Sequence, residues 1–166
     1  TNVIGSTAAR ETDDVLYIRA GPEIGVAATK TFSSQVTALA LLAERLHRDI
    51  TGEPSEHSAG LLDSLGALPD QIESILDADP TAELTRKYEG MDAHFFIGRG
   101  IAHPVALEGA LKFKEITYEH AEGFAAGQLK HGPLALVTPN TVVIAVFTGD
   151  HDEKTLNNVR EVQARG

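Results

Sequence analysis

Cysteine is absent from this chain of 166 residues. Its absence excludes disulfide bonds, thiolate metal sites and a cysteine nucleophile within the chain. Long hydrophobic runs are absent as well. No apolar stretch reaches about 18 residues, so the sequence predicts no transmembrane helix, and no charged segment followed by an apolar one marks a leader peptide. These absences predict a cytoplasmic protein.

Basic residues are scarce. The chain carries 14 lysines and arginines against 24 aspartates and glutamates, which gives a formal net charge of −10. This balance argues against nucleic acid and anionic membranes as partners, since both require basic patches, although a local basic pocket for one phosphate remains open. Apart from His131, the histidines show no metal-ligand spacing such as HxxxH on a helix, so the sequence predicts no metal site and no cofactor.

Apolar segments alternate with helical ones along the chain. The apolar segments predict buried strands at residues 2–5, 15–18, 93–97 and 141–147. Helical periodicity is found at residues 28–48, from about Pro104 onward, and at 152–165. Hydrophobic residues at 42% are sufficient for a sizeable core. The alternation predicts an α/β fold, a parallel sheet flanked by helices in a Rossmann-type αβα sandwich.

Between these two α/β parts, residues 51–91 have the pattern of a helical connector. Two or three amphipathic helices are predicted between Ser55 and Tyr88, interrupted at Pro69 and Pro80. The chain also begins at Thr1, without methionine and directly before a strand-like segment. We therefore expect the end of one α/β domain, joined by helices to the start of another.

One helical face carries three charged residues. Glu108, Lys112 and Glu115 stand at positions i, i+4 and i+7, which places them on the same side of a helix whose other sides are mostly apolar. Two carboxylates and an amine arranged in this way suit proton transfer on a small polar substrate. The alternative from spacing alone is a solvated face with ordinary ion pairs.

Two turns add further candidates. His131 lies in Lys130-His131-Gly132-Pro133, where glycine and proline restrict the backbone; an imidazole held there can act as acid or base, or can simply hold the turn by a hydrogen bond. Gly98-Arg99-Gly100 follows a predicted strand and precedes a helix, a suitable place to bind an anion. It is not the dinucleotide fingerprint, because His103 replaces the third glycine.

Four segments together resemble a known family. They read AGPEIGVAATKTF (20–32), GRG (98–100), ALEGALKFKEITYEHAE (106–122) and AGQLKHGPLAL (126–136). They resemble the isomerase region of the glutamine–fructose-6-phosphate aminotransferases, or glucosamine-6-phosphate synthases, which contains two sugar isomerase (SIS) domains. The resemblance implies that residues 1–50 are the second half of the first SIS domain, 51–91 the connector, and 92–166 the first half of the second.

The resemblance also implies roles for individual residues. Glu115 matches the base that moves a proton between C1 and C2 of the open-chain sugar. His131 matches the histidine of ring opening, which in the family reaches the neighbouring subunit's site. Lys112 and Glu108 match polar residues that line the pocket, and Val26 matches a backbone contact to the sugar. The candidate substrate-binding residues are therefore Val26, Glu108 and Arg99. Arg99 is included because of its place in the Gly98-Arg99-Gly100 turn.

The implied reaction converts fructose 6-phosphate and glutamine to glucosamine 6-phosphate and glutamate, in a homodimer. The family's phosphate-binding loop and imine-forming lysine match no part of this chain, so we expect little activity from the chain alone, and we expect its half-sheets to pair internally or to dimerise. Two alternatives stay open: another SIS-type deglycase or isomerase, and a non-catalytic module that binds sugar phosphates.

Overall fold

The computed structural model describes residues 1–79 and 81–166. It consists of two compact units, Thr1–Ala82 and Glu83–Gly166, and each is described here by itself. The helices of the first unit are α1 (Thr7–Glu11), α2 (Lys30–Thr51) and α3 (Ser58–Ala78), and α4 (Thr81–Tyr88) leads into the second unit. No helix among the residues that the structure describes is long and apolar enough to cross a membrane.

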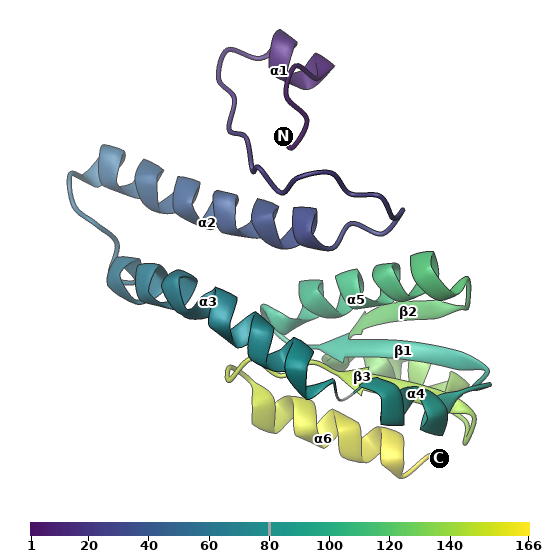
Figure 1. Ribbon diagram of the computed structural model, residues 1–166. Helices are drawn as coiled ribbons and strands as arrows, with labels where there is room; N and C mark the ends of the chain where they lie inside the picture. The colour runs from purple at the N-terminus through teal and green to yellow at the C-terminus, as the bar shows by residue number, and fades with distance from the viewer. Residues whose placement is uncertain (80) are drawn as a thin grey trace. The chain divides into compact units, whose positions relative to one another are not determined.

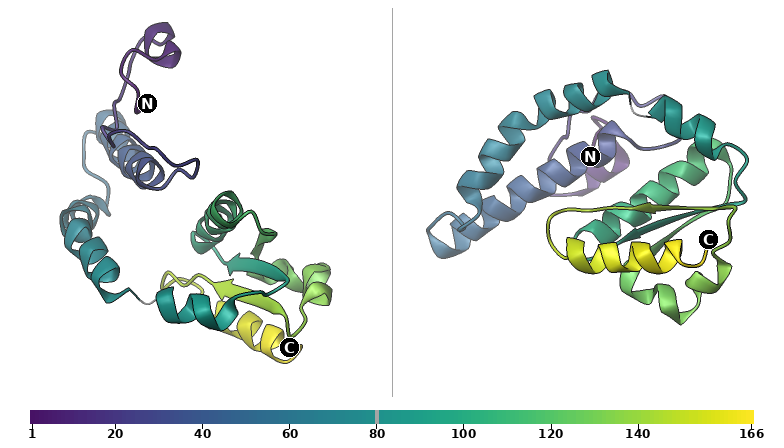
Figure 2. Two further views of the ribbon diagram at one scale, coloured as in Figure 1. Left: turned by 45° about the vertical axis from the view of Figure 1, so that its right-hand side comes forward. Right: turned by 90° about the horizontal axis from the view of Figure 1, so that it is seen from below.

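The second unit is built on a parallel sheet of three strands. They are β1 (Ala93–Gly98), β2 (Ala121–Ala125) and β3 (Thr141–Ala145), in the order β2-β1-β3. Because β1 is central, its Phe95 and Ile97 are fully buried. The sheet lies between α5 (Ala102–Thr117) on one face and α6 (Asp152–Gln163) on the other (Figure 1, Figure 2). The predicted fold class, a parallel sheet flanked by helices, is confirmed.

Small residues allow α5 to pack closely on this sheet. Its buried side is a row of alanines, Ala102, Ala106 and Ala110, spaced one helical turn apart. On the strand side, a Cβ at Gly123 would lie 2.8 Å from the Cα of Leu107. On the opposite face of the sheet the core is formed by larger side chains. They are Ile97 and Leu129, with Val159 and Val162 of α6 packed against them.

The predicted strands at residues 2–5 and 15–18 are wrong. Both segments lack strand structure, and they contain exposed apolar side chains such as Ile4 and Leu16. They lie beside each other, since Thr1 N donates to the carbonyl of Leu16 and Ile18 N to that of Thr1. An apolar segment forms a buried strand only where neighbouring strands satisfy its backbone groups and cover its side chains. The first unit contains no sheet that does so among its described residues.

Other expectations also need correction. Helix α3 continues through Pro69, because a helix of 21 residues tolerates the loss of one backbone hydrogen bond; Pro80 lies outside the described residues. Strand β3 ends at Ala145 and is half-buried rather than buried on both faces, because it is an edge strand. Strand β2 was not predicted. Its sequence, AEGFA, has little strand propensity, and its pairing with β1 determines its conformation.

Candidate active site

Helix α5 brings Glu108, Lys112 and Glu115 into one hydrogen-bonded cluster. Lys112 Nζ lies 2.5 Å from Glu115 Oε2 and 3.4 Å from Glu108 Oε1. The three side chains are only 18–26% exposed, because they lie on the flank of a helix that also packs Phe113 against His94, with ring centroids 4.3 Å apart. The alternative of a fully solvated face does not describe this cluster.

The cluster keeps its amine protonated. The hydrogen bond to Glu115 raises the pKa of Lys112 above its ordinary 10.5; partial burial opposes the shift and Glu108 adds to it. At neutral pH the Glu115 carboxylate therefore lies beside a permanent positive charge. A carboxylate can accept a carbon-bound proton while a neighbouring ammonium stabilises negative charge that develops on substrate oxygen. The cluster therefore combines a candidate base with a fixed positive charge, an arrangement suited to proton transfer on a small polar molecule.

His131 lies apart from this cluster within the chain. It ends the short 3-10 helix η1 (Ala126–His131), which directly follows the carboxyl end of β2. Helix α5 runs back along the sheet, so Glu115 in its last turn lies toward the amino ends of the strands. The segment that contains His131 is held in place by buried Leu129 and by an ion pair of 2.8 Å between Lys130 and Glu161. His131 itself is exposed, and no hydrogen bond joins its side chain to another described residue.

Val26 lies in the first unit, in a loop before α2. Its side chain is 85% exposed. The loop is closed by Glu23, whose carboxylate accepts hydrogen bonds from the backbone N–H and hydroxyl of Thr29 and from the hydroxyl of Thr31. The Thr31 hydroxyl, followed by the backbone of Thr29, lowers the pKa of Glu23 from its ordinary 4.5 to about 2. An ionised Glu23 thus fixes the loop that presents the backbone of Val26.

The titration of Glu23 tests this loop. The pKa of Glu23 is lower in the folded chain than in the unfolded one. The ionised Glu23 carboxylate therefore contributes fully to folding stability above pH 4.5, and this contribution is lost as the pH falls from 4.5 to about 2. We expect the side-chain carboxyl carbon of Glu23 to titrate near pH 2 by NMR, and Thr31→Val to move the midpoint upward. Thr37→Val is the control, since that hydroxyl bonds the carbonyl of Ser33. A midpoint near 4.5 in the unsubstituted chain contradicts this account.

Arg99 lies at the amino end of α5, far from Glu115. Glu115 follows Ala102 by 13 positions along the helix, a rise of about 20 Å at 1.5 Å per residue. Arg99 instead contacts Asn158 of α6 and lines a pocket with side chains that sequence reasoning missed, among them His103, His151 and Lys154. One signal was available: Lys154 and Asn158 are four residues apart in the predicted terminal helix and so share a face.

The structure thus assembles part of the predicted site. It joins Glu108, Lys112 and Glu115, and it places His131 and Arg99 elsewhere in the same unit. Val26 belongs to the other unit. The roles of all six residues remain predictions.

Comparison with known proteins identifies the family. The model of the SIS domain matches residues 1–45 and 92–166. The chain is 55% identical over its whole length to the glutamine–fructose-6-phosphate aminotransferase (isomerizing) of Halobacterium salinarum and covers 28% of that protein. It is 49% identical to the protein of that name from Methanosarcina acetivorans, with 99% of this chain and 27% of that protein aligned. The chain spans little more than a quarter of these curated relatives.

Solved structures of related proteins support the same family. The C-terminal domain of glucosamine-fructose-6-phosphate aminotransferase from Francisella tularensis superposes with a TM-score of 0.91 at 39% identity, over 99% of this chain and 47% of that one. A putative phosphosugar isomerase from Silicibacter pomeroyi gives a TM-score of 0.77 at 30% identity, over 98% and 47%. The resemblance read from the sequence motifs is confirmed.

Proposed function

The chain belongs to the SIS-domain family, and on that premise we propose that it forms part of the isomerase of a glutamine–fructose-6-phosphate aminotransferase. The observation that carries the proposal is the half-buried pair of Glu115 and Lys112 on α5, a base beside a fixed positive charge. The proposed reaction is the conversion of fructose 6-phosphate and glutamine to glucosamine 6-phosphate and glutamate. Cytoplasmic location and independence from a cofactor are parts of the same proposal.

In this mechanism Glu115 moves the proton between C1 and C2 of the open-chain sugar. Its carboxylate takes the proton from one carbon, and the electron pair of the broken C–H bond forms the double bond of an enediol-like intermediate. The same carboxyl group then returns the proton to the neighbouring carbon, while the proton of the C1 hydroxyl passes to the heteroatom on C2 and C1 becomes the carbonyl carbon. Lys112 stabilises the negative charge that develops on the sugar oxygen. Glu108 holds Lys112 from the other side, at 3.4 Å.

His131 is proposed to act across a homodimer. It opens the sugar ring by exchanging the proton of the ring hydroxyl, a suitable task for an imidazole. Its exposure, and its place at the end of the sheet opposite to Glu115, support a role in the site of a second copy rather than in its own.

The remaining assignments are proposed on the same grounds. Val26 contacts the sugar through its backbone, on the loop that Glu23 closes. Arg99 is retained as a substrate-binding candidate, although its pocket is separate from Glu115. The division of the chain into 1–50, 51–91 and 92–166 follows the two SIS halves and the connector.

A hybrid enzyme tests the proposal. The matching segment of the Halobacterium salinarum protein, aligned with the whole of this chain at 55% identity, is replaced by residues 1–166. We expect the hybrid to form glucosamine 6-phosphate from fructose 6-phosphate and glutamine, because the inserted residues 1–166 supply the proton-transfer cluster. A folded hybrid that binds fructose 6-phosphate without isomerising it contradicts the proposal.

The alternatives predict different outcomes with the same hybrid. If the chain comes from another SIS deglycase or isomerase, a panel of amino-sugar and fructosamine phosphates will be turned over in preference to fructose 6-phosphate. If it is a module that only binds sugar phosphates, the hybrid will bind fructose 6-phosphate but will be inactive before any residue is substituted.

A further inference from the structure

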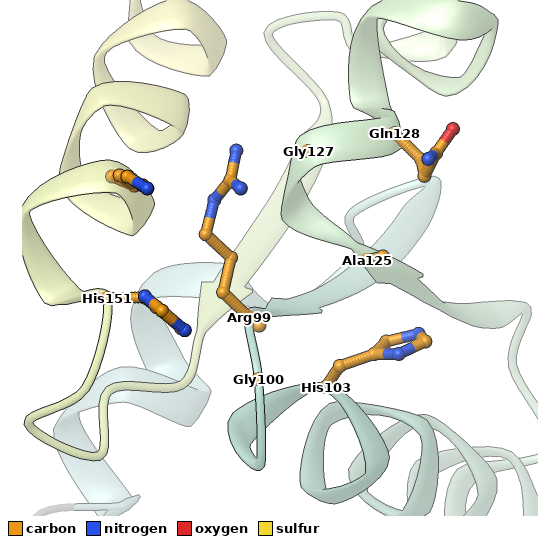
Figure 3. Close-up of a pocket in the computed structure, with 9 residues that line it drawn as sticks. Arg99, Gly100, His103, Ala125, Gly127, Gln128 and His151 are labelled. Atoms are coloured by element: carbon orange, nitrogen blue, oxygen red, sulfur yellow. The ribbon is translucent and has the colours of Figure 1, made fainter.

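The pocket that Arg99 lines lies at the carboxyl edge of the sheet in the second unit. It has a volume of about 300 Å³ and is bounded by the Gly98-Arg99-Gly100 turn, the end of β2 with the start of η1, and the amino end of α6. Figure 3 shows Arg99 extending between α6 and η1, with His151 and His103 on either side of its backbone. No role has been given to this pocket in the proton transfer described above.

The charge of the lining sets this pocket apart. Arg99, His103, His151 and Lys154 contribute nitrogen-bearing side chains, and none of its nine lining residues is a carboxylic acid. In a chain with a formal net charge of −10, this is a locally basic cavity on an acidic protein. Such a cavity attracts anions and repels cations.

Buried groups hold Arg99 in place and leave part of its guanidinium available. The side-chain oxygen of Asn158 accepts hydrogen bonds from Arg99 Nε at 3.1 Å and from Nη2 at 2.9 Å. Asn158 is itself buried, and its amide nitrogen donates to Glu161 Oε2 at 3.1 Å. These contacts occupy one edge of the guanidinium, so Nη1 and the second hydrogen of Nη2 remain for a ligand.

Two glycines make room for the basic side chains. A Cβ at Gly127 would lie 3.0 Å from Arg99 Nη2, and a Cβ at Gly100 would lie 3.1 Å from the ring of His151. Gly100 also has a φ of +53°, a left-handed conformation that other residues rarely adopt. A larger residue at either position would press on the side chain of Arg99 or His151.

We propose that this pocket binds the phosphate group of a small phosphorylated metabolite, at a site separate from the proton-transfer cluster. Its volume is at the lower end of the range for small-molecule sites, which suits a phosphate with a short polar chain. The exposed amide of Gln128, at the rim of the pocket, can hydrogen-bond to hydroxyl groups of that chain. The site includes Arg99, a substrate-binding candidate of the proposed function, but it is inferred only from the geometry and charge of this pocket.

The test is a titration of the 166-residue chain, followed by backbone amide NMR shifts, with inorganic phosphate and separately with glycerol 3-phosphate. Saturable shifts are expected at residues 98–100, at Gly127 and at 151–154. Equal affinity for the two probes indicates that the site recognises the phosphate group alone. Tighter binding of glycerol 3-phosphate indicates that the pocket also contacts the organic part of the ligand. Absence of saturable shifts, or shifts confined to the Glu115 cluster, overturns the proposal.

Matched lysine variants make the test specific. Lys154→Gln removes one exposed charge from the pocket, and we expect phosphate affinity to fall about fivefold. Lys114→Gln removes the same charge from an exposed position in the last turn of α5 and will change affinity less than about twofold. Equal effects of the two variants indicate only a general charge effect and overturn the proposal.

Gly127→Ala provides a second variant that changes no charge. Its Cβ would make the Arg99 guanidinium shift by a few tenths of an ångström, so phosphate affinity is expected to fall about threefold. If Gly127→Ala leaves the amide spectrum of the sheet intact and phosphate binding unchanged, Arg99 does not contact the anion and the proposed site is wrong.

Discussion

Replacement of Glu115 by glutamine will lower the rate of sugar isomerisation by about 10³-fold in the hybrid enzyme. The amide keeps the size and hydrogen-bonding reach of the carboxyl group but cannot accept a carbon-bound proton. Because the lost interaction belongs to the transition state, kcat and kcat/KM should fall together while the affinity for fructose 6-phosphate stays within about twofold. Steady-state kinetics and equilibrium binding measure the two quantities separately.

The matched control is Glu122→Gln. Glu122 lies on β2, and its side chain is 48% exposed and 3.9 Å from His120, so the same chemical change there should leave isomerisation unaffected. Exchange of solvent deuterium into C1 and C2 of the sugar provides an independent readout of the proton transfer. If deuterium enters the sugar at the normal rate with Glu115→Gln, another group is the base.

The second large effect concerns folding of the second unit. Gly98→Ala will destabilise it by about 3 kcal/mol or more. A Cβ at Gly98 would lie 2.3 Å from the carbonyl oxygen of Ala102 and 2.9 Å from the backbone nitrogen of His103. Both contacts are with backbone atoms, so the overlap is relieved only by moving the start of α5 away from the end of β1.

Hydrogen exchange of individual amides measures this effect, since it reports the sheet separately from the helices of the first unit. The amides of β1 should lose protection in Gly98→Ala. Gly66→Ala is the control: it lies within α3 with no atom within 4 Å of its added Cβ, and helix propensity favours alanine there by about 1 kcal/mol. If the β1 amides keep their protection in Gly98→Ala, the close contact between Gly98 and the start of α5 does not limit the stability of the second unit.

Local patterns in the sequence predicted much of the second unit. Residues 93–97 combine apolar and aromatic side chains before a glycine turn, and they form the central strand β1. The helix after it and the terminal helix follow from periodicity, because side chains one turn apart face the same core. The same spacing placed Glu108, Lys112 and Glu115 together. Contacts between residues three or four apart on a helix need no tertiary information.

The strands at residues 2–5 and 15–18 could not be settled in this way. Their apolar composition suits a buried strand. An apolar segment forms a strand, however, only when neighbouring strands satisfy its backbone hydrogen bonds, and the presence of such neighbours depends on the fold rather than on the segment. The reverse holds for β2. Its weak strand propensity is overcome by pairing with β1 from His94 to Gly98.

By itself, the sequence determined the α/β class of this protein, its family resemblance and the charged face of α5, because these depend on local spacing and on long motifs that can be read directly. Only the tertiary structure decided which distant groups meet. Arg99 lies against Asn158, 59 residues away, and joins Lys154 in a basic pocket, whereas His131 lies apart from Glu115. The parallel sheet brings the carboxyl ends of its strands to one edge, and this edge is defined only when the strands pair.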